Sequence, residues 1–104
     1  MKRLQVVEQI RERMAGIIPK VETILYGSEA RGDARPDSDI DLLVLVDGDR
    51  LTIADEDRII APLYDLEIES GIQINARVLL KKIWEQRPFI TPFHANVMRE
   101  GIVL

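Results

Sequence analysis

The sequence predicts a small α+β domain in which helices flank a mixed β-sheet of about three to four strands. Residues 42–46 are apolar at every position, which is typical of a central strand covered on both faces. Residues 4–17 and 53–70 place apolar side chains three and four positions apart, which is typical of amphipathic helices. A chain of 104 residues supports one hydrophobic core, so we expect a single domain over residues 1–104.

The first half of the chain predicts a helix followed by two strands. Apolar residues recur at helical spacing up to Gly16, where the first helix is expected to end. Residues 21–26 alternate weakly between polar and apolar side chains, which predicts a short strand. A short helix is expected over residues 28–31, and the second strand is expected over residues 40–46.

The next part of the chain predicts a long helix, a strand and a short helix. The helix over residues 53–70 contains Pro62, which removes a backbone hydrogen bond in a helix interior. That helix is therefore expected either to kink at Pro62 or to begin near it. Residues 72–80 alternate strictly, which predicts a strand with one polar face, and a short helix is expected over residues 81–86.

The last part of the chain predicts a helix and an edge strand. Thr91 suits the N-cap of a helix over residues 92–100, because its hydroxyl can accept a hydrogen bond from the first turn. Gly101 follows the expected end of that helix. Residues 102–104 can then add a short strand at the edge of the sheet.

Composition excludes several classes of protein and site. The chain has no cysteine and one histidine, which excludes disulfides and disfavours the usual kinds of zinc site. A net charge of −4 disfavours a broad nucleic-acid-binding surface. No apolar run reaches the roughly 20 residues that span a bilayer, and the first residues do not resemble a signal peptide. We therefore expect no membrane contact and a cytoplasmic location.

Two aspartates at the start of the second strand suggest metal binding. Asp39 and Asp41 are two residues apart, so their side chains are expected on one face of the strand. Carboxylates this close repel each other unless a cation lies between them. Mg²⁺ binds proteins through one or two carboxylates together with substrate phosphates. The pair therefore suggests phosphoryl or nucleotidyl transfer, whereas the alternative is a solvated turn before a strand.

Gly27 and Ser28 add a feature that suits phosphate binding. A glycine after a strand lets the backbone approach a ligand closely, and successive N–H groups at this turn can bind phosphate oxygens. The alternative is an ordinary β-turn that leads into a helix cap. Together with the aspartates, the turn predicts one pocket, with phosphates at one strand end and a metal at the next.

These residues carry a family resemblance. Gly27-Ser28, ten intervening residues and Asp39-Ile40-Asp41 resemble the signature of the nucleotidyltransferase (polymerase-beta-like) superfamily. The wider string over residues 27–44 is similar to the minimal nucleotidyltransferase branch, which includes the MntA-like antitoxins. The resemblance implies the small nucleotidyltransferase fold over most of the chain.

The same resemblance implies a role for each matched residue. Gly27 and Ser28 would hold the triphosphate of ATP, and Arg31 would lie near the phosphates. Asp39 and Asp41 would be the catalytic residues and would bind one or two Mg²⁺ ions. ATP is therefore the expected substrate, and Mg²⁺ is the expected cofactor.

One position departs from the family pattern. The family commonly supplies a third carboxylate from a later strand, but residues 72–80 contain no acid. The polar face of that strand offers Gln73, Asn75 and Arg77 instead, and we expect Asn75 to contact the nucleotide. Glu67 or Glu69, just upstream, is an alternative source of the acid, although their place on a helix predicts exposure to solvent.

The resemblance also implies what the chain acts on. Members of this branch are often the antitoxin half of a pair with a helical HEPN-type toxin, and some transfer AMP from ATP to a tyrosine of that toxin. We therefore expect transfer of AMP to a hydroxyl group of a partner protein, and self-association is also compatible with the sequence. The alternative is a catalytically impaired antitoxin that lacks the third carboxylate and neutralises its partner by contact alone.

Overall fold

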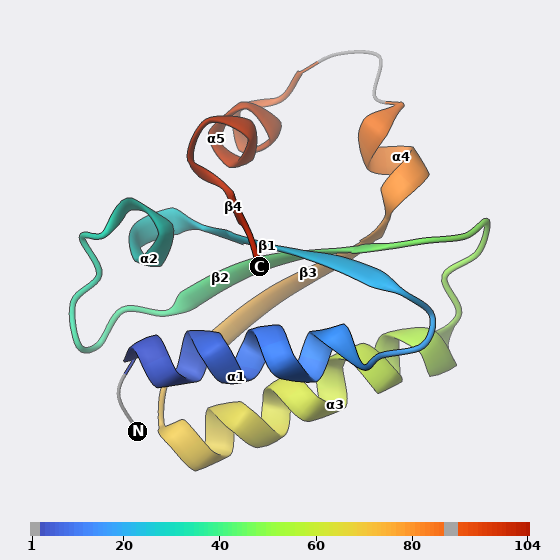
Figure 1. The fold of residues 1–104 in the computed structure, drawn as a ribbon. Coiled ribbons are helices and arrows are strands. Elements are labelled where there is room, and N and C mark those ends of the chain that lie inside the picture. Colours follow the sequence, from blue (N-terminus) through green and yellow to red (C-terminus); the bar gives the residue numbers. More distant parts are fainter. Residues whose placement is uncertain (1–2, 87–89) are drawn as a thin grey trace.

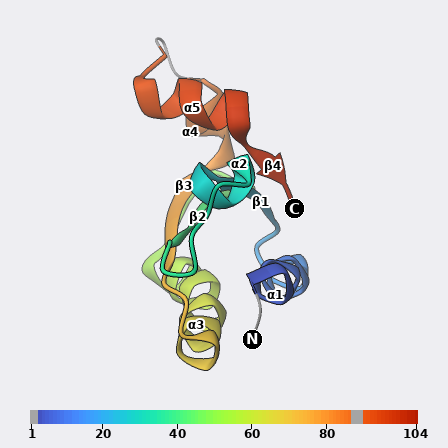
Figure 2. The same cartoon turned by 90° about the vertical axis from the view of Figure 1, so that its left-hand side faces the viewer.

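The helices of the chain lie on both faces of a β-sheet (Figure 1, Figure 2). The structure is a computed structural model and describes residues 3–86 and 90–104. Helices α1 (Arg3–Ala15) and α3 (Ile53–Ser70) cover one face, and α4 (Lys81–Glu85) and α5 (Pro92–Glu100) lie on the other. The predicted α+β fold is therefore confirmed.

The sheet is mixed, with four strands in the order β3-β2-β1-β4. Strand β2 (Ile40–Val46) pairs antiparallel with β1 (Val21–Tyr26) and parallel with β3 (Ile74–Leu80). The crossover that a parallel pair requires is provided by α3. The short strand β4 (Ile102–Val103) pairs antiparallel with β1, which confirms the expected edge strand.

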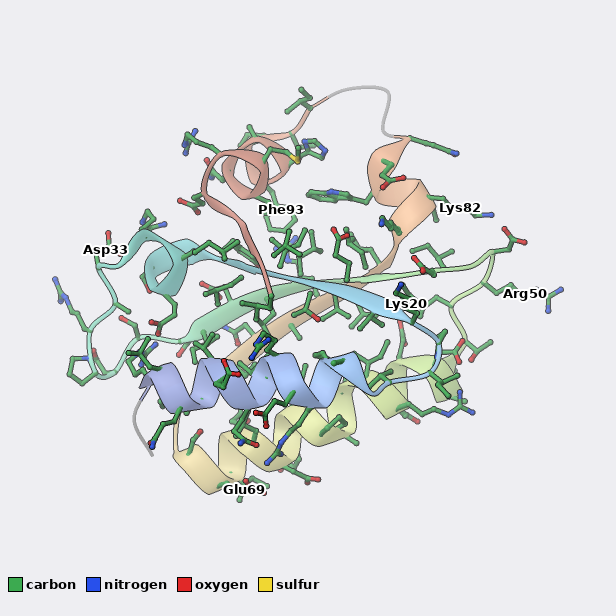
Figure 3. The ribbon with its side chains drawn as sticks, viewed as in Figure 1. Lys20, Asp33, Arg50, Glu69, Lys82 and Phe93 are labelled. Carbon is green, nitrogen blue, oxygen red and sulfur yellow. The ribbon has the colours of Figure 1, made fainter. Side chains whose placement is uncertain are left out.

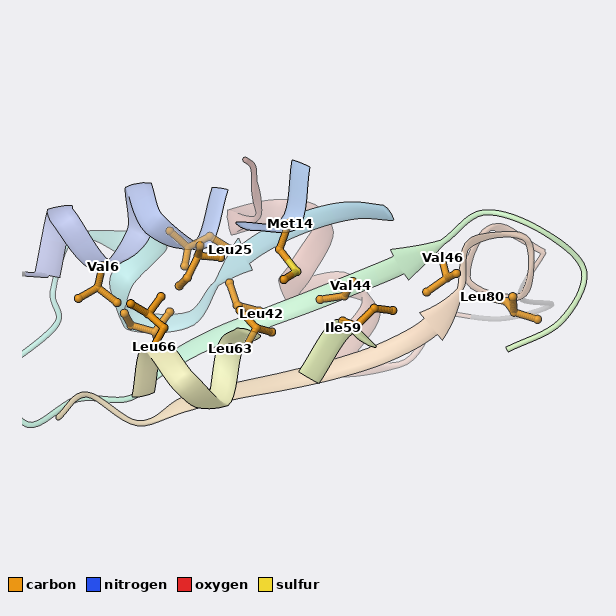
Figure 4. Packing of buried hydrophobic residues seen from close by; sticks show 12 residues of the cluster. Val6, Met14, Leu25, Leu42, Val44, Val46, Ile59, Leu63, Leu66 and Leu80 are labelled. Atoms are coloured by element: carbon orange, nitrogen blue, oxygen red, sulfur yellow. The ribbon is translucent and has the colours of Figure 1, made fainter. Parts of the chain in front are cut away.

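Strand β2 forms the centre of the hydrophobic core. Its even-numbered residues, such as Leu42 and Val44, pack with α1 and α3, and Figure 4 shows this cluster. Its odd-numbered residues Leu43 and Leu45 pack on the other face with Trp84 and with residues of α5. The prediction that both faces of this strand are covered is confirmed.

No helix in the described part of the chain is long and apolar enough to cross a membrane.

Helix α3 begins at Ile53 and continues past Pro62, so the expectation that it could begin near Pro62 was wrong. The reason is a capping box. The hydroxyl of Thr52 accepts a hydrogen bond from the backbone N–H of Asp55, and the carboxylate of Asp55 accepts one from the N–H of Thr52. Buried apolar residues on both sides of Pro62 then hold the helix against the core.

Strand β3 begins two residues later than the alternation predicts, at Ile74 instead of residue 72. Gly71 ends α3 in the left-handed conformation, with φ of 73°. The next backbone N–H groups bond to side chains of that helix end, because Ile72 donates to Ser70 and Ile74 donates to Glu67. These contacts delay the start of regular pairing with β2.

We expect replacement of Gly101 by alanine to lower the free energy of unfolding by about 2 kcal/mol, because overpacking forces neighbours apart. A Cβ atom there would lie 2.8 Å from Cγ2 of Ile24 and still closer to the carbonyl oxygen of Val97. Urea denaturation measures the effect. Gly16→Ala is the matched control, since nothing lies within 4 Å of a Cβ atom at Gly16. Equal losses in both variants would contradict the packing argument.

Candidate active site

Strand pairing brings the predicted site residues to one end of the sheet. Tyr26, the last residue of β1, lies opposite Asp41 of β2. Asp41 in turn lies beside Asn75 in the parallel pairing with β3. Gly27 begins helix α2 (Gly27–Arg31) directly after Tyr26. The end of β1 and the beginnings of β2 and β3 therefore form one cluster of polar groups.

A single amide group bridges the two aspartates. The side-chain nitrogen of Asn75 donates to Oδ2 of Asp39 at 3.0 Å and to Oδ1 of Asp41 at 3.3 Å. The side-chain nitrogen of Gln73 donates to Oδ1 of Asn75 at 3.1 Å and so orients that amide. The two carboxylates thus share one face, as the spacing predicts. Because the amide donates to both, it offsets part of their mutual repulsion.

Gly27 brings the backbone of the turn against one of these carboxylates. Its φ is 75°, in the left-handed region that favours glycine. A Cβ atom at this position would lie 2.5 Å from Oδ2 of Asp41. Ser28 follows, and its carbonyl oxygen accepts hydrogen bonds from the N–H groups of Gly32 and Asp33 at 3.0 and 3.1 Å, which closes α2. The predicted phosphate-binding turn and the predicted metal ligand are therefore in direct proximity.

The sequence did not indicate Glu100, the last residue of α5, as part of this site. Its carboxylate accepts a hydrogen bond from the N–H of Gly27 at 3.3 Å. It also forms an ion pair of 3.2 Å with Arg31, which bonds to Asp33 as well. Hydrogen bonds to Glu100 first, and to Asp33 second, raise the pKa of Arg31. Glu100 belongs to no motif. The sequence feature that could have indicated it is its place at a helix C-terminus, where the helix dipole disfavours a negatively charged side chain.

A pocket of about 530 Å³ lies beside Asp41. This volume is within the range of small-molecule sites, roughly 300–1,000 Å³. The pocket lies along the outer edge of β3 and is bounded by α3. Besides Asp41, its lining residues are Tyr26, Ile60, Leu63, Tyr64, Glu67, Ile74, Asn75, Ala76 and Arg77. Asp41 therefore lies next to both the turn at Gly27 and a hollow that can hold a second group.

Two residues that line this pocket, Tyr26 and Arg77, also contact Phe93 of α5. Figure 3 shows Phe93 pointing from α5 toward the sheet. The Phe93 ring meets Tyr26 edge to face at 5.4 Å, and the guanidinium of Arg77 lies 4.2 Å from its centre. Burial first, and the nearby Asp41 carboxylate second, raise the pKa of Tyr26. Tyr26 is thus a neutral hydroxyl at ordinary pH, held beside the carboxylates.

The two upstream glutamates differ in their positions. Glu67 lines the pocket, is half-buried, and accepts a hydrogen bond from the N–H of Ile74 at 2.8 Å. Glu69 is exposed and pairs with Arg13 at 3.0 Å. The expectation of exposure holds for Glu69 and was wrong for Glu67, because the start of β3 covers that side chain.

The chain matches a known family over most of its length. The model of the nucleotidyltransferase domain family matches residues 7–101, which include the turn at Gly27 and both aspartates. The chain belongs to this family. The resemblance carried by Gly27-Ser28 and Asp39-Ile40-Asp41 is therefore confirmed at the level of the family.

This nucleotidyltransferase domain also resembles a protein of Methanocaldococcus jannaschii that is named as a protein adenylyltransferase. The two sequences are 36% identical over 98 residues, which are 94% of this chain and 89% of the relative. The similarity thus extends beyond the motif to nearly the whole of both chains.

Solved structures share the fold of this nucleotidyltransferase domain. A toxin-antitoxin crystal structure with AMP-PNP aligns with a TM-score of 0.59 at 19% identity, over 99% of this chain and 72% of that one. A nucleotidyltransferase from Sulfolobus solfataricus aligns with a TM-score of 0.56 at 22% identity, over 96% of this chain and 77% of that one. At these identities the likeness shows the fold alone, which is the expected small nucleotidyltransferase fold.

The oxygen donors of the nucleotidyltransferase domain fit a hard divalent cation. Asp39 and Asp41 present carboxylate oxygens on one face, and the absent side chain of Gly27 leaves room beside Oδ2 of Asp41. Mg²⁺ takes such ligands and completes its shell with water and phosphate oxygens. Among residues 3–86 and 90–104, no group of three or more Asp, Glu, His or Cys side chains could hold a metal. The donor set is thus a carboxylate pair.

Proposed function

We propose that this nucleotidyltransferase domain transfers AMP from ATP to a hydroxyl group of a partner protein and releases pyrophosphate. The observation that carries the proposal is the pair of carboxylates, Asp39 and Asp41, held together beside the turn at Gly27. The family supports nucleotidyl transfer, and the relative named as a protein adenylyltransferase supports ATP as donor and a protein as acceptor.

Each group has a defined task in this proposal. The backbone N–H groups of Gly27 and Ser28, with the guanidinium of Arg31, bind the triphosphate. Asp39 and Asp41 hold Mg²⁺, which neutralises charge on the phosphates and on the leaving group when it is bound. The residues of the chain therefore act mainly by positioning and by electrostatics.

The transfer step balances as an in-line displacement. The acceptor hydroxyl oxygen forms a bond to the α-phosphorus while the bond to the oxygen that bridges to the β-phosphorus breaks. Pyrophosphate leaves with that electron pair. The hydroxyl proton passes to Glu67, the carboxylate in the wall of the pocket beside Asp41. An acceptor that enters this pocket would lie next to Asp41.

The acceptor that we propose is a tyrosine of a helical HEPN-type toxin. Solved structures with this fold include toxin-antitoxin complexes, one of them described as MntA-HpeT, with a TM-score of 0.58 at 19% identity over 99% of this chain and 72% of that one. In this proposal the small domain binds the nucleotide and offers little further surface to position a second substrate. The acceptor hydroxyl is therefore positioned by the partner protein that carries it.

The test is transfer of label from ATP to the protein encoded by the neighbouring gene. With Mg²⁺ and ATP labelled at the α-phosphate, we expect the partner to become labelled. ATP labelled at the γ-phosphate should leave it unlabelled, which separates AMP transfer from phosphorylation. Chelation of the metal should abolish the reaction. Equal labelling by the wild type and by a variant with alanine at both Asp39 and Asp41 would refute the proposal.

A second function is favoured by the missing third carboxylate. A contact-only antitoxin would bind its toxin without chemistry, and the polar face of β3 carries Asn75 where the family commonly has an acid. The two functions predict different outcomes for the double alanine variant in a growth-rescue assay. Loss of rescue with retained partner binding supports the enzyme, and full rescue supports contact alone.

We expect Glu67→Gln to reduce the rate of AMP transfer about a hundredfold. This factor is the lower end of the rate enhancement that a general base typically contributes. The glutamine oxygen can still accept the hydrogen bond from Ile74, so the fold is preserved, but the side chain cannot take a proton. Glu69→Gln is the matched control, since Glu69 pairs with Arg13 away from the pocket. An unchanged rate in Glu67→Gln would remove Glu67 from the mechanism.

A further inference from the structure

A carboxylate of the chain itself occupies the groups that would bind phosphate. The N–H of Gly27 donates to Oε1 of Glu100 at 3.3 Å, and Nη1 of Arg31 lies 3.2 Å from Oε2 of Glu100. These are two of the donors to which the triphosphate is assigned. The side chain of Glu100 is 14% exposed, whereas that of Arg31 is 47% exposed. The carboxylate is therefore enclosed between α5 and α2, with its oxygens directed at the phosphate-binding turn.

The position of Glu100 in its own helix does not explain this arrangement. Glu100 is the last residue of α5, where the free carbonyl groups of the helix disfavour a negative charge. Its carboxylate accepts hydrogen bonds from Gly27 and Arg31, which lie 73 and 69 residues earlier in the chain. Contacts with the phosphate-binding turn thus offset an unfavourable location at the helix end.

We propose that Glu100 is an internal competitor of the nucleotide, because its carboxylate takes the place of one phosphate group until ATP displaces it. This inference rests on the proposed function, since it assigns Gly27 and Arg31 to the triphosphate. A ligand must then bring enough negative charge to replace a carboxylate that is already bound. A triphosphate meets that requirement, and the cost of displacing Glu100 lowers the apparent affinity of each ligand that takes its place by the same factor.

The contacts of Glu100 are of a kind that a ligand can replace. The hydrogen bond from Gly27 is long for an N–H to oxygen bond, at 3.3 Å. Arg31 is half exposed, so solvent weakens its attraction to Glu100. A triphosphate offers several charged acceptor oxygens to the same donors, which favours exchange of the carboxylate for phosphate.

The test is calorimetric binding of AMP-PNP with Mg²⁺ to the wild type and to Glu100→Ala and Glu100→Gln. We expect both variants to bind AMP-PNP about tenfold more tightly than the wild type. The reason is that the ligand no longer has to break one charge-assisted contact of Glu100. Melting temperatures report whether α5 stays folded in each variant, and the glutamine variant preserves the shape of the side chain.

Asp33→Asn is the matched control. Asp33 is the other carboxylate that pairs with Arg31, but it lies on the exposed loop after α2 (Figure 3). The substitution changes the net charge by the same amount as Glu100→Gln. We expect its effect on AMP-PNP affinity to stay within about threefold, as for an exposed ion pair.

The outcomes separate this inference from the proposed function. Tighter binding by both Glu100 variants, with Asp33→Asn near the wild type, supports the competitor. If the wild type binds AMP-PNP and the Glu100 variants bind it equally or more weakly, the competitor is refuted and the nucleotide site stands. If neither the wild type nor any variant binds AMP-PNP, the proposed function is refuted and the inference falls with it.

Discussion

Replacement of Asp41 by asparagine is expected to lower AMP transfer by at least about a thousandfold, the scale of losing a preorganised charge at a phosphoryl-transfer site. Asparagine has nearly the shape of aspartate but supplies no negative charge to hold a divalent cation. Stability should not fall, because Asp39 and Asp41 repel each other when no cation is bound. Initial rates of label transfer and the melting temperature measure the two effects separately.

Asp37→Asn is the control for that substitution. Asp37 is an exposed residue of the loop before β2, two positions before Asp39, and the change removes the same charge. We expect its rate to stay within about twofold of the wild type, since salt and solvent screen exposed charges. If Asp37→Asn and Asp41→Asn lowered the rate equally, the loss would reflect general charge, and the metal role of Asp41 would be refuted.

The sequence predicted those parts of the fold that depend on local pattern. The run at residues 42–46 has no polar position, and a strand with two covered faces is the arrangement that buries all of them. The spacing of Asp39 and Asp41 likewise places both side chains on one face, because strand geometry alternates with a period of two. Neither prediction needed any information about distant residues.

The position of Asn75 shows what a local pattern leaves open. Alternation places Asn75 on the polar face of β3, but it does not determine which residue of β2 lies beside it. That register follows from the parallel crossover through α3 and from the late start of β3 at Ile74. Only the paired sheet shows that the amide bridges Asp39 and Asp41.

The sequence could not reveal Glu100, nor favour Glu67 over Glu69, because these positions depend on packing between distant elements. The end of α5 meets the start of α2, which brings Glu100 to a backbone N–H group 73 residues away. The end of α3 meets the start of β3, which turns Glu67 toward the pocket. The spacing of apolar residues shows which side chains share a face of a helix. It does not show which other elements the ends of that helix contact.

Gly27→Ala is expected to reduce AMP transfer by more than about a hundredfold, the scale of misplacing a catalytic group by about 1 Å. It should also lower the free energy of unfolding by about 2–3 kcal/mol. Two causes act together. The φ of 75° disfavours any side chain, and the added Cβ atom would lie 2.5 Å from Oδ2 of Asp41, so the carboxylate must move. Urea denaturation and initial rates of label transfer measure these effects.

Gly32→Ala separates the two causes. Gly32 has a similar φ of 82°, but nothing lies within 4 Å of a Cβ atom at that position. Alanine there should cost about 1 kcal/mol from backbone strain alone and leave the rate of transfer close to that of the wild type. A hundredfold loss of rate in Gly27→Ala but not in Gly32→Ala would locate the effect at the contact with Asp41. Equal rates in both variants would mean that the approach of the turn to this carboxylate does not matter for catalysis.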